Sequence, residues 1–212
     1  KLHINVDTGM SRYGVSCQKP EEIDTAVEMI RKISYLKNCQ IDGIYTHFAI
    51  AEVAEDGFTM NQFQLFRTLL TQLEKNDIQV GIRHCCNSSA TLLYPEMHLD
   101  MVRCGIAIYG LPHVRTGVPF LPALTLKAMV AATRKIAAGE SVSYGRTYLA
   151  KKDMEIATLA IGYAEGYFRH LSNLDHVIFR DKLLPIVGVV CMDALMVDAT
   201  GSGIEVGDWV EI

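Results

Sequence analysis

The first 110 residues alternate between short runs rich in β-forming residues and longer runs with helical periodicity, and this alternation most constrains the fold. The strand-length runs are LHINV, DGIYTHF, IRHCC and MVRCGIAIYG, the last of which ends in a turn. The runs with helical spacing are PEEIDTAVEMIRKI, FTMNQFQLFRTLLTQLEKN and SSATLLY. Repeated β-then-α units predict parallel strands with crossover helices, and about four such units correspond to half of a (β/α)₈ barrel.

The alternation of predicted strands and helices ends at the proline-containing stretch LPHVRTGVPFLP. Beyond it, strand-length runs are separated by Gly, Asp-Lys and Gly-Asp turn signals; they are LTLKAMVAATRKI, SVSYGRTYLA, MEIATLAIGYAEG, HVIFRDKLLPIVGVVCMDALMVDAT and GDWVEI. We therefore predict an α/β first domain at residues 1–119 and an all-β second domain at residues 120–212.

Composition narrows the classes of function. The 212 residues are 50% hydrophobic with a net charge of −4 and no basic block, which favours a small ligand over nucleic acid or an anionic membrane. No run is long and apolar enough to cross a membrane. The six cysteines include no CxxC pair, so we expect buried thiols in a reducing compartment and no metal site.

Asn87 and Ser88 stand where a predicted strand passes into a short helix. Hydroxyl and free N–H groups converge at such a point and can bind an anion, but Asn and Ser are also ordinary helix N-caps. In barrels, phosphate sites form from the loops after the last strands. Gly105 and Ile106 follow the next predicted strand, so their N–H groups are candidates for the same phosphate.

Arg12, His47 and Arg103 occupy predicted strand ends, where barrel enzymes gather catalytic groups. Arg103 would leave a cofactor ring nitrogen unprotonated, because a guanidinium only donates; the alternative is a structural ion pair. His47 alone could equally be a core histidine. Tyr144 lies beside Gly145 in the β domain, where it is either a base with a pKa lowered by its surroundings or a packed strand residue.

Seven motifs, in order and spanning nearly the whole chain, resemble those of the pyridoxal-phosphate-dependent alanine racemases, including their serine-racemizing relatives. They are DTGMSRYGV, IYTHFA, HCCNSSA, MVRCGIAIYGL, VSYGRTY, IGYAEG and PIVGVVCMD. The resemblance implies the second half of a (β/α)₈ TIM-like barrel followed by an all-β C-terminal domain. It also implies a homodimer, paired head to tail, with shared active sites.

The resemblance assigns roles to individual residues. The pyridoxal 5'-phosphate ligands would be the pyridine-nitrogen partner Arg103, Arg12, and the phosphate ligands Asn87, Ser88, Gly105 and Ile106. The catalytic tyrosine would be Tyr144, serving the other subunit, with His47 orienting it. Arg12 would also bind the substrate carboxylate, helped by the Met192 backbone, while Tyr163 and Arg169 would line the substrate entrance.

The implied reaction is interconversion of L- and D-alanine, which supplies D-alanine for cell-wall peptidoglycan. An amino acid held as an imine of the cofactor loses its α-proton to one base and regains one on the opposite face, so tyrosine and lysine must flank it. The family's lysine motif, similar to KANAYGHG, is absent from residues 1–212. We therefore expect a fragment that lacks the first half of its barrel and the end of its β domain, and that is inactive alone.

Three positions depart from the family pattern. Asn5 stands where many members carry a carbamylated lysine, so we expect either a chloride ion beside Arg12 or an arginine held only by neutral acceptors. Val189 replaces a common arginine and Glu165 an aspartate, both at the substrate entrance.

Other functions remain open on the sequence. A serine racemase would be cytoplasmic like an alanine racemase, or the cytoplasmic domain of a membrane protein. A non-catalytic pyridoxal-phosphate carrier would end after the barrel, and the β domain argues against it. A lyase or aldolase on the same plan would need a metal, and the segment around Cys191 offers no second soft ligand.

Overall fold

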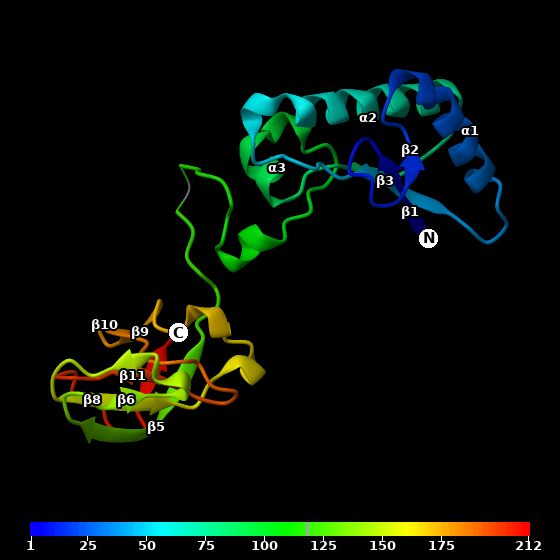
Figure 1. The fold of residues 1–212 in the computed structure, drawn as a ribbon. Helices are drawn as coiled ribbons and strands as arrows, with labels where there is room; N and C mark the ends of the chain where they lie inside the picture. Colours follow the sequence, from blue (N-terminus) through cyan, green and yellow to red (C-terminus); the bar gives the residue numbers. More distant parts are fainter. Residues whose placement is uncertain (118) are drawn as a thin grey trace. The chain divides into compact units, whose positions relative to one another are not determined.

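A computed structural model describes residues 1–117 and 119–212. The chain divides into two units, Lys1–Ala123 and Leu124–Ile212 (Figure 1). The boundary predicted from the sequence lies four residues earlier, after residue 119. Each unit has its own apolar core.

The first unit is a four-stranded parallel sheet with the order β2-β1-β3-β4. The strands are β1 (Leu2–Asp7), β2 (Val15–Ser16), β3 (Ile41–Thr46) and β4 (Ile82–His84). The helices α1 (Ile23–Ser34) and α2 (Phe58–Lys75) contact each other and lie on one side of the sheet (Figure 1). Short 3-10 turns occupy Pro20–Glu22, Ala54–Asp56, Pro95–Met97 and Ile106–Tyr109.

The core of this unit lies between the sheet and the helices. Ile4, Val6 and Ile44 are buried on the strands, and Ile30 and Phe66 face them from α1 and α2. The buried positions of α1 follow helical spacing, as the sequence predicts; they are Ile23, Ala26, Val27 and Ile30. This packing fixes the carboxyl ends of the strands relative to one another.

The prediction of a strand at MVRCGIAIYG is wrong. Met101 forms a single parallel bridge with His84, and residues 106–109 turn into a 3-10 helix. The backbone still runs beside β4, since Asp100 N donates to Arg83 O at 3.1 Å and Arg103 N to Cys86 O at 2.9 Å. The ladder stops there because the hydroxyl of Ser88 accepts the next N–H groups, as described below.

The second unit is a six-stranded antiparallel sheet with the order β10-β9-β12-β5-β8-β11. Its strands are β5 (Lys127–Ile136), β8 (Met154–Leu159), β9 (His176–Phe179), β10 (Lys182–Pro185), β11 (Leu195–Asp198) and β12 (Trp209–Glu211). An antiparallel bridge between Ile186 and Val197 joins the two edges and closes the sheet around a core. The hairpin of β6 (Ser141–Val142) and β7 (Tyr148–Leu149) covers part of its outer face.

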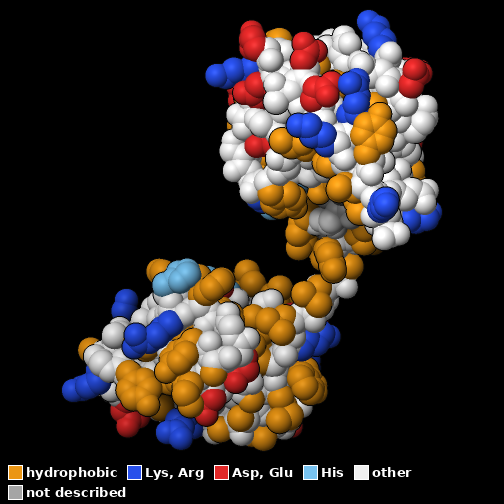
Figure 2. All heavy atoms as spheres, turned by 90° about the vertical axis from the view of Figure 1, so that its right-hand side faces the viewer, with side chains coloured by type: hydrophobic (Ala, Val, Ile, Leu, Met, Phe, Trp, Pro, Cys, Tyr) orange, Lys and Arg blue, Asp and Glu red, His pale blue; other side chains and the backbone are white. Residues whose placement is uncertain are grey.

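Three short 3-10 turns of this unit carry candidate site residues, at Tyr144–Arg146, Tyr163–Glu165 and Arg169–Leu171. Among the described residues, no helix has both the length and the apolar character to cross a membrane. Figure 2 shows hydrophobic side chains on the visible surface of both units. Several exposed ones fall between residues 108 and 126, namely Ile108, Tyr109, Leu111, Leu121, Leu124 and Leu126.

Candidate active site

The carboxyl ends of β1 and β3 are held together by a small buried polar cluster. The hydroxyls of Thr8 and Thr46 lie 2.6 Å apart. Gln62 of α2 donates through Nε2 to Thr8 Oγ1 and to the carbonyl of His47, both at 3.2 Å, and its Oε1 accepts from Ala49 N. Because every arm of this amide is used, it fixes the backbone of His47 against the strand end.

Arg103 is the centre of the first unit's site. Its Nη1 donates to His84 Nδ1 at 2.6 Å, and its Nη2 donates to the Thr46 carbonyl at 3.0 Å and to His47 Nδ1 at 3.2 Å. The guanidinium lies over the ring of Tyr45, 5.0 Å from its centroid. No carboxylate in the described part of the chain pairs with it, so the structural ion pair considered above is not seen.

The contacts of Arg103 determine the tautomers of its neighbours. A guanidinium only donates, so His84 Nδ1 and His47 Nδ1 must both be acceptors. The proton of His84 therefore sits on Nε2, which donates to His3 Nδ1 at 2.8 Å. Burial and the charge of Arg103 lower the pKa of His84 to about 4 and also lower that of His47. Both rings are neutral at neutral pH, with the Nε2–H of His47 available to donate.

Arg12 adds a second positive charge near this cluster. It lies in the loop after β1, which is tied down because Asp7 Oδ1 accepts from Gly9 N and Ser11 N. Burial alone would raise the pKa of Asp7, but these hydrogen bonds lower it. The Arg12 guanidinium is exposed and lies 5.0 Å from the centroid of the Tyr13 ring.

Asn5 lies beneath the same loop. Its Nδ2 donates to the carbonyl of Tyr13, while its buried Oδ1 has no hydrogen-bond partner among the described residues. Gly14 allows the close approach, because a Cβ there would lie 2.5 Å from Asn5 Nδ2 and the φ of Gly14 is +127°. The site thus contains two arginines, which suit an anionic ligand, and two neutral histidines, while the Asn5 amide oxygen is an acceptor that needs a donor.

Ser88 gathers two backbone donors at the end of β4. Its Oγ accepts from Gly105 N at 2.9 Å and from Ala107 N at 3.2 Å. A Cβ at Gly105 would meet only this oxygen, at 4.0 Å, so the space beside Gly105 is open. Asn87 caps α3 (Ser88–Leu93), with Oδ1 accepting from Ala90 N, as the ordinary capping interpretation predicts. Ile106 is exposed at the start of the adjoining turn.

The second unit brings Tyr144, Tyr163, Arg169 and Met192 around one depression of about 690 Å³. Tyr144 is 70% exposed and Tyr163 48% exposed, so both hydroxyls are accessible. The backbone of Met192 serves the Tyr163 turn, because its carbonyl accepts from Ala164 N at 2.8 Å. The predicted site residues therefore form two groups, one in each unit.

Sequence reasoning missed three members of the first group, His3, Tyr45 and His84. Tyr45 stacks on His84 with centroids 5.0 Å apart and planes 7° apart. Tyr45 and His47 are two residues apart in the predicted strand DGIYTHF, so alternation would place them on one face and could have revealed Tyr45. His84 lies at the end of β4. Its contact with Tyr45 depends on the register between β3 and β4, which cannot be predicted from the sequence pattern.

Comparison with known proteins identifies the family. The model of the alanine racemase N-terminal domain matches residues 1–113, and that of the alanine racemase C-terminal domain matches residues 123–212. The alanine racemase of Desulfovibrio desulfuricans is 42% identical over 203 residues, covering 94% of this chain and 53% of the relative. That of Methanococcus maripaludis is 41% identical, covering 100% of this chain and 57% of the relative.

Solved structures agree. An alanine racemase of Clostridium difficile 630 superposes with a TM-score of 0.91 at 30% identity, covering 99% of this chain and 55% of its own. The Bartonella henselae alanine racemase, solved with covalently bound pyridoxal phosphate, gives a TM-score of 0.81 at 33% identity over 99% of this chain and 56% of its own. This chain spans about half the length of these relatives. With both domain models matched across nearly its whole length, the chain belongs to the alanine racemase family.

Proposed function

We propose that residues 1–212 act within a longer polypeptide that racemizes alanine with pyridoxal 5'-phosphate. The observation that carries the proposal is the pairing of Arg103 with two neutral histidines and with no carboxylate of the described residues. An arginine held in this way faces any ring nitrogen as a permanent donor. Such a contact disfavours protonation of that nitrogen and so favours racemization over transamination.

The residues present fit the cofactor. Gly105 N and Ala107 N already converge on one oxygen, that of Ser88, and the open space beside Gly105 leaves room for a phosphate. Asn87, Ser88, Gly105 and Ile106 would hold the phosphate, Arg103 the pyridine nitrogen and Arg12 the phenolic oxygen. When bound, the cofactor supplies an electron sink for the substrate α-carbon.

The chain's own side chains do the remaining work. Tyr144 would carry a proton on its hydroxyl, which is exposed and unshared among the described hydrogen bonds. His47 would orient it by donating through Nε2, while Arg12 binds the substrate carboxylate beside the Met192 backbone. Tyr163 and Arg169 would line the entrance.

We further propose that the parallel sheet is the second half of a (β/α)₈ barrel and that the protein is a homodimer with shared active sites. Two features support this arrangement. The sheet has no further strand beyond β2 among the described residues, and large apolar side chains between residues 108 and 126 are exposed. Tyr144 would then serve the site of the other subunit.

Tyr144→Phe in the full-length protein tests the function. The ring and its packing are kept and only the proton carrier is lost, so we expect racemization to fall by about three orders of magnitude or more, within the range of acid–base contributions. Cofactor binding, measured by absorbance, should be unchanged. Chiral chromatography of alanine measures the rate.

Mixed dimers test the shared site. Tyr144→Phe subunits mixed with Arg103→Gln subunits should regain about one working site per heterodimer, because that site takes an unchanged Arg103 from one chain and an unchanged Tyr144 from the other. Each parent homodimer is the control. Full racemization by Tyr144→Phe would refute the role of Tyr144 as a base. Failure of the mixture to recover activity would refute active sites shared between subunits.

A further inference from the structure

The backbone on both sides of Tyr144 is strained. Ser143 has φ 65° and ψ −174°, a region occupied almost only by glycine, and Gly145 and Arg146 follow with φ of 69° and 51°. A non-glycine residue in such a conformation costs about 1–3 kcal/mol. Because Ser143 immediately precedes Tyr144, the backbone conformation of Ser143 sets the direction in which the Tyr144 side chain points.

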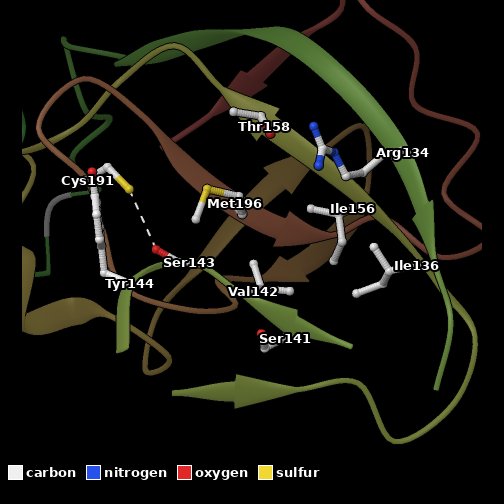
Figure 3. A pocket seen from close by; sticks show the side chains of 10 residues that line it. All are labelled: Arg134, Ile136, Ser141, Val142, Ser143, Tyr144, Ile156, Thr158, Cys191 and Met196. Carbon is white, nitrogen blue, oxygen red and sulfur yellow. Dashed lines mark hydrogen bonds between the residues drawn. The ribbon is translucent and has the colours of Figure 1, made fainter. Parts of the chain in front are cut away.

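The side chain of Ser143 holds this conformation in place. Its hydroxyl donates to the carbonyl of Val189 at 2.6 Å and lies 3.6 Å from Cys191 Sγ (Figure 3). The Cys191 thiol lies within reach of the same carbonyl, with its Sγ 3.6 Å from Val189 O, so all three groups meet at one point. Gly188 permits the approach, since a Cβ there would lie 2.7 Å from Ser143 Cβ.

The segment that Ser143 binds also holds the second tyrosine. Cys191 O accepts from Tyr163 N at 3.0 Å, and a Cβ on Gly162 would lie 2.4 Å from the same carbonyl. The segment 189–192 therefore lies between the turns of Tyr144 and Tyr163 and is bonded to both. Ser143 is the side-chain link on the Tyr144 side.

We propose that Ser143 is a positioning residue for Tyr144, whose hydroxyl locks the tyrosine turn to the segment 189–192. The inference rests on the function proposed above. A purely structural role is better met by glycine, which adopts this backbone without strain. Serine adds to the turn only its hydroxyl, and that hydroxyl aims the tyrosine.

Ser143→Gly separates positioning from stability in the full-length holoenzyme. Glycine relieves the strain but removes the hydroxyl, so we expect a Tm equal to or above that of Ser143→Ala, with kcat reduced roughly tenfold to a hundredfold in both variants, as for small misplacements of a catalytic group. KM should change less than twofold. Ser141→Ala is the matched control, because Ser141 accepts only from Arg146 Nε in the same turn and should keep its kcat.

Isotope effects supply a readout that a structural role would not move. If Tyr144 serves one face of the substrate, α-deuteration should slow Ser143→Gly more than the parent protein with one enantiomer of alanine and not with the other. An unchanged kcat in Ser143→Gly, a kcat that falls only in step with Tm, or equal isotope effects for both enantiomers would overturn the inference. If Tyr144→Phe itself racemizes normally, the proposed function fails instead.

Discussion

The fold keeps His84 neutral well below the pH at which a free histidine gains its proton. In the unfolded chain a histidine titrates near 6.5, whereas burial and Arg103 lower the folded pKa to about 4. Between these values the unfolded chain binds more protons, so the stability from neutral His84 is complete above about pH 6.5 and lost as pH falls toward 4.

We expect His84→Asn to flatten this loss. Asparagine can still accept from Arg103 but does not titrate, so its Tm should fall less between pH 7 and pH 4.5 than that of the parent protein. Thermal melts of the full-length protein at the two pH values measure the difference. His113→Asn, at an exposed position, is the control. Equal losses in the parent and in His84→Asn would show that His84 does not govern this window.

Arg12 carries a positive charge that needs a partner. No carboxylate among the described residues pairs with it, and Asn5 offers only an oxygen acceptor. We expect chloride to bind against the guanidinium, and an anomalous signal there in crystals soaked with bromide. Asn5→Asp should abolish the signal, because the new carboxylate would hold the arginine directly. A parent crystal without the peak would contradict the chloride interpretation and leave Arg12 with neutral acceptors.

Among the elements, α3 has a helix cap, Asn87, whose capping role can be separated from the phosphate-binding role proposed for it. Asn87 caps the helix through Oδ1, and an aspartate oxygen caps equally well. Asn87→Asp should therefore keep the Tm of the cofactor-free protein while weakening pyridoxal-phosphate binding through repulsion of the phosphate. Asn87→Ala should lower stability by about 1 kcal/mol. Absorbance titration and melts measure the two effects, and unchanged affinity in Asn87→Asp would mean that Asn87 only caps.

The sequence predicted the elements best where one face is buried. The spacing of α1 and the strand runs of β1 and β3 predicted their positions because periodicity reports burial directly. The sequence pattern failed at Met101–Cys104, where the Ser88 hydroxyl accepts the N–H of Gly105 that a longer strand would donate to its neighbour. A side chain 17 residues away in sequence leaves no periodic signal. Tyr45 beside His84 was missed for the same reason, since register between strands is a tertiary property.

For the whole molecule, we expect residues 1–212 expressed alone to aggregate or to melt without cooperativity. The parallel sheet has an open edge at β2 among the described residues, and large apolar side chains between residues 108 and 126 are exposed. Residues 124–212 are the internal control, because the bridge from Ile186 to Val197 closes their sheet. Calorimetry and light scattering measure the outcome; a cooperative, monomeric and active 212-residue protein would refute the half-barrel proposal.

The hydrogen bonds from Arg103 through His84 to His3 all run in one direction, each donor facing the next acceptor. A ligand that hydrogen-bonds to Arg103 would change the strength of both hydrogen bonds in this row without moving the backbone. His3 stands at the exposed end of that row. Its ring nitrogens therefore make a natural spectroscopic reporter, through which nitrogen NMR at the protein surface can follow what binds to the half-buried guanidinium of Arg103.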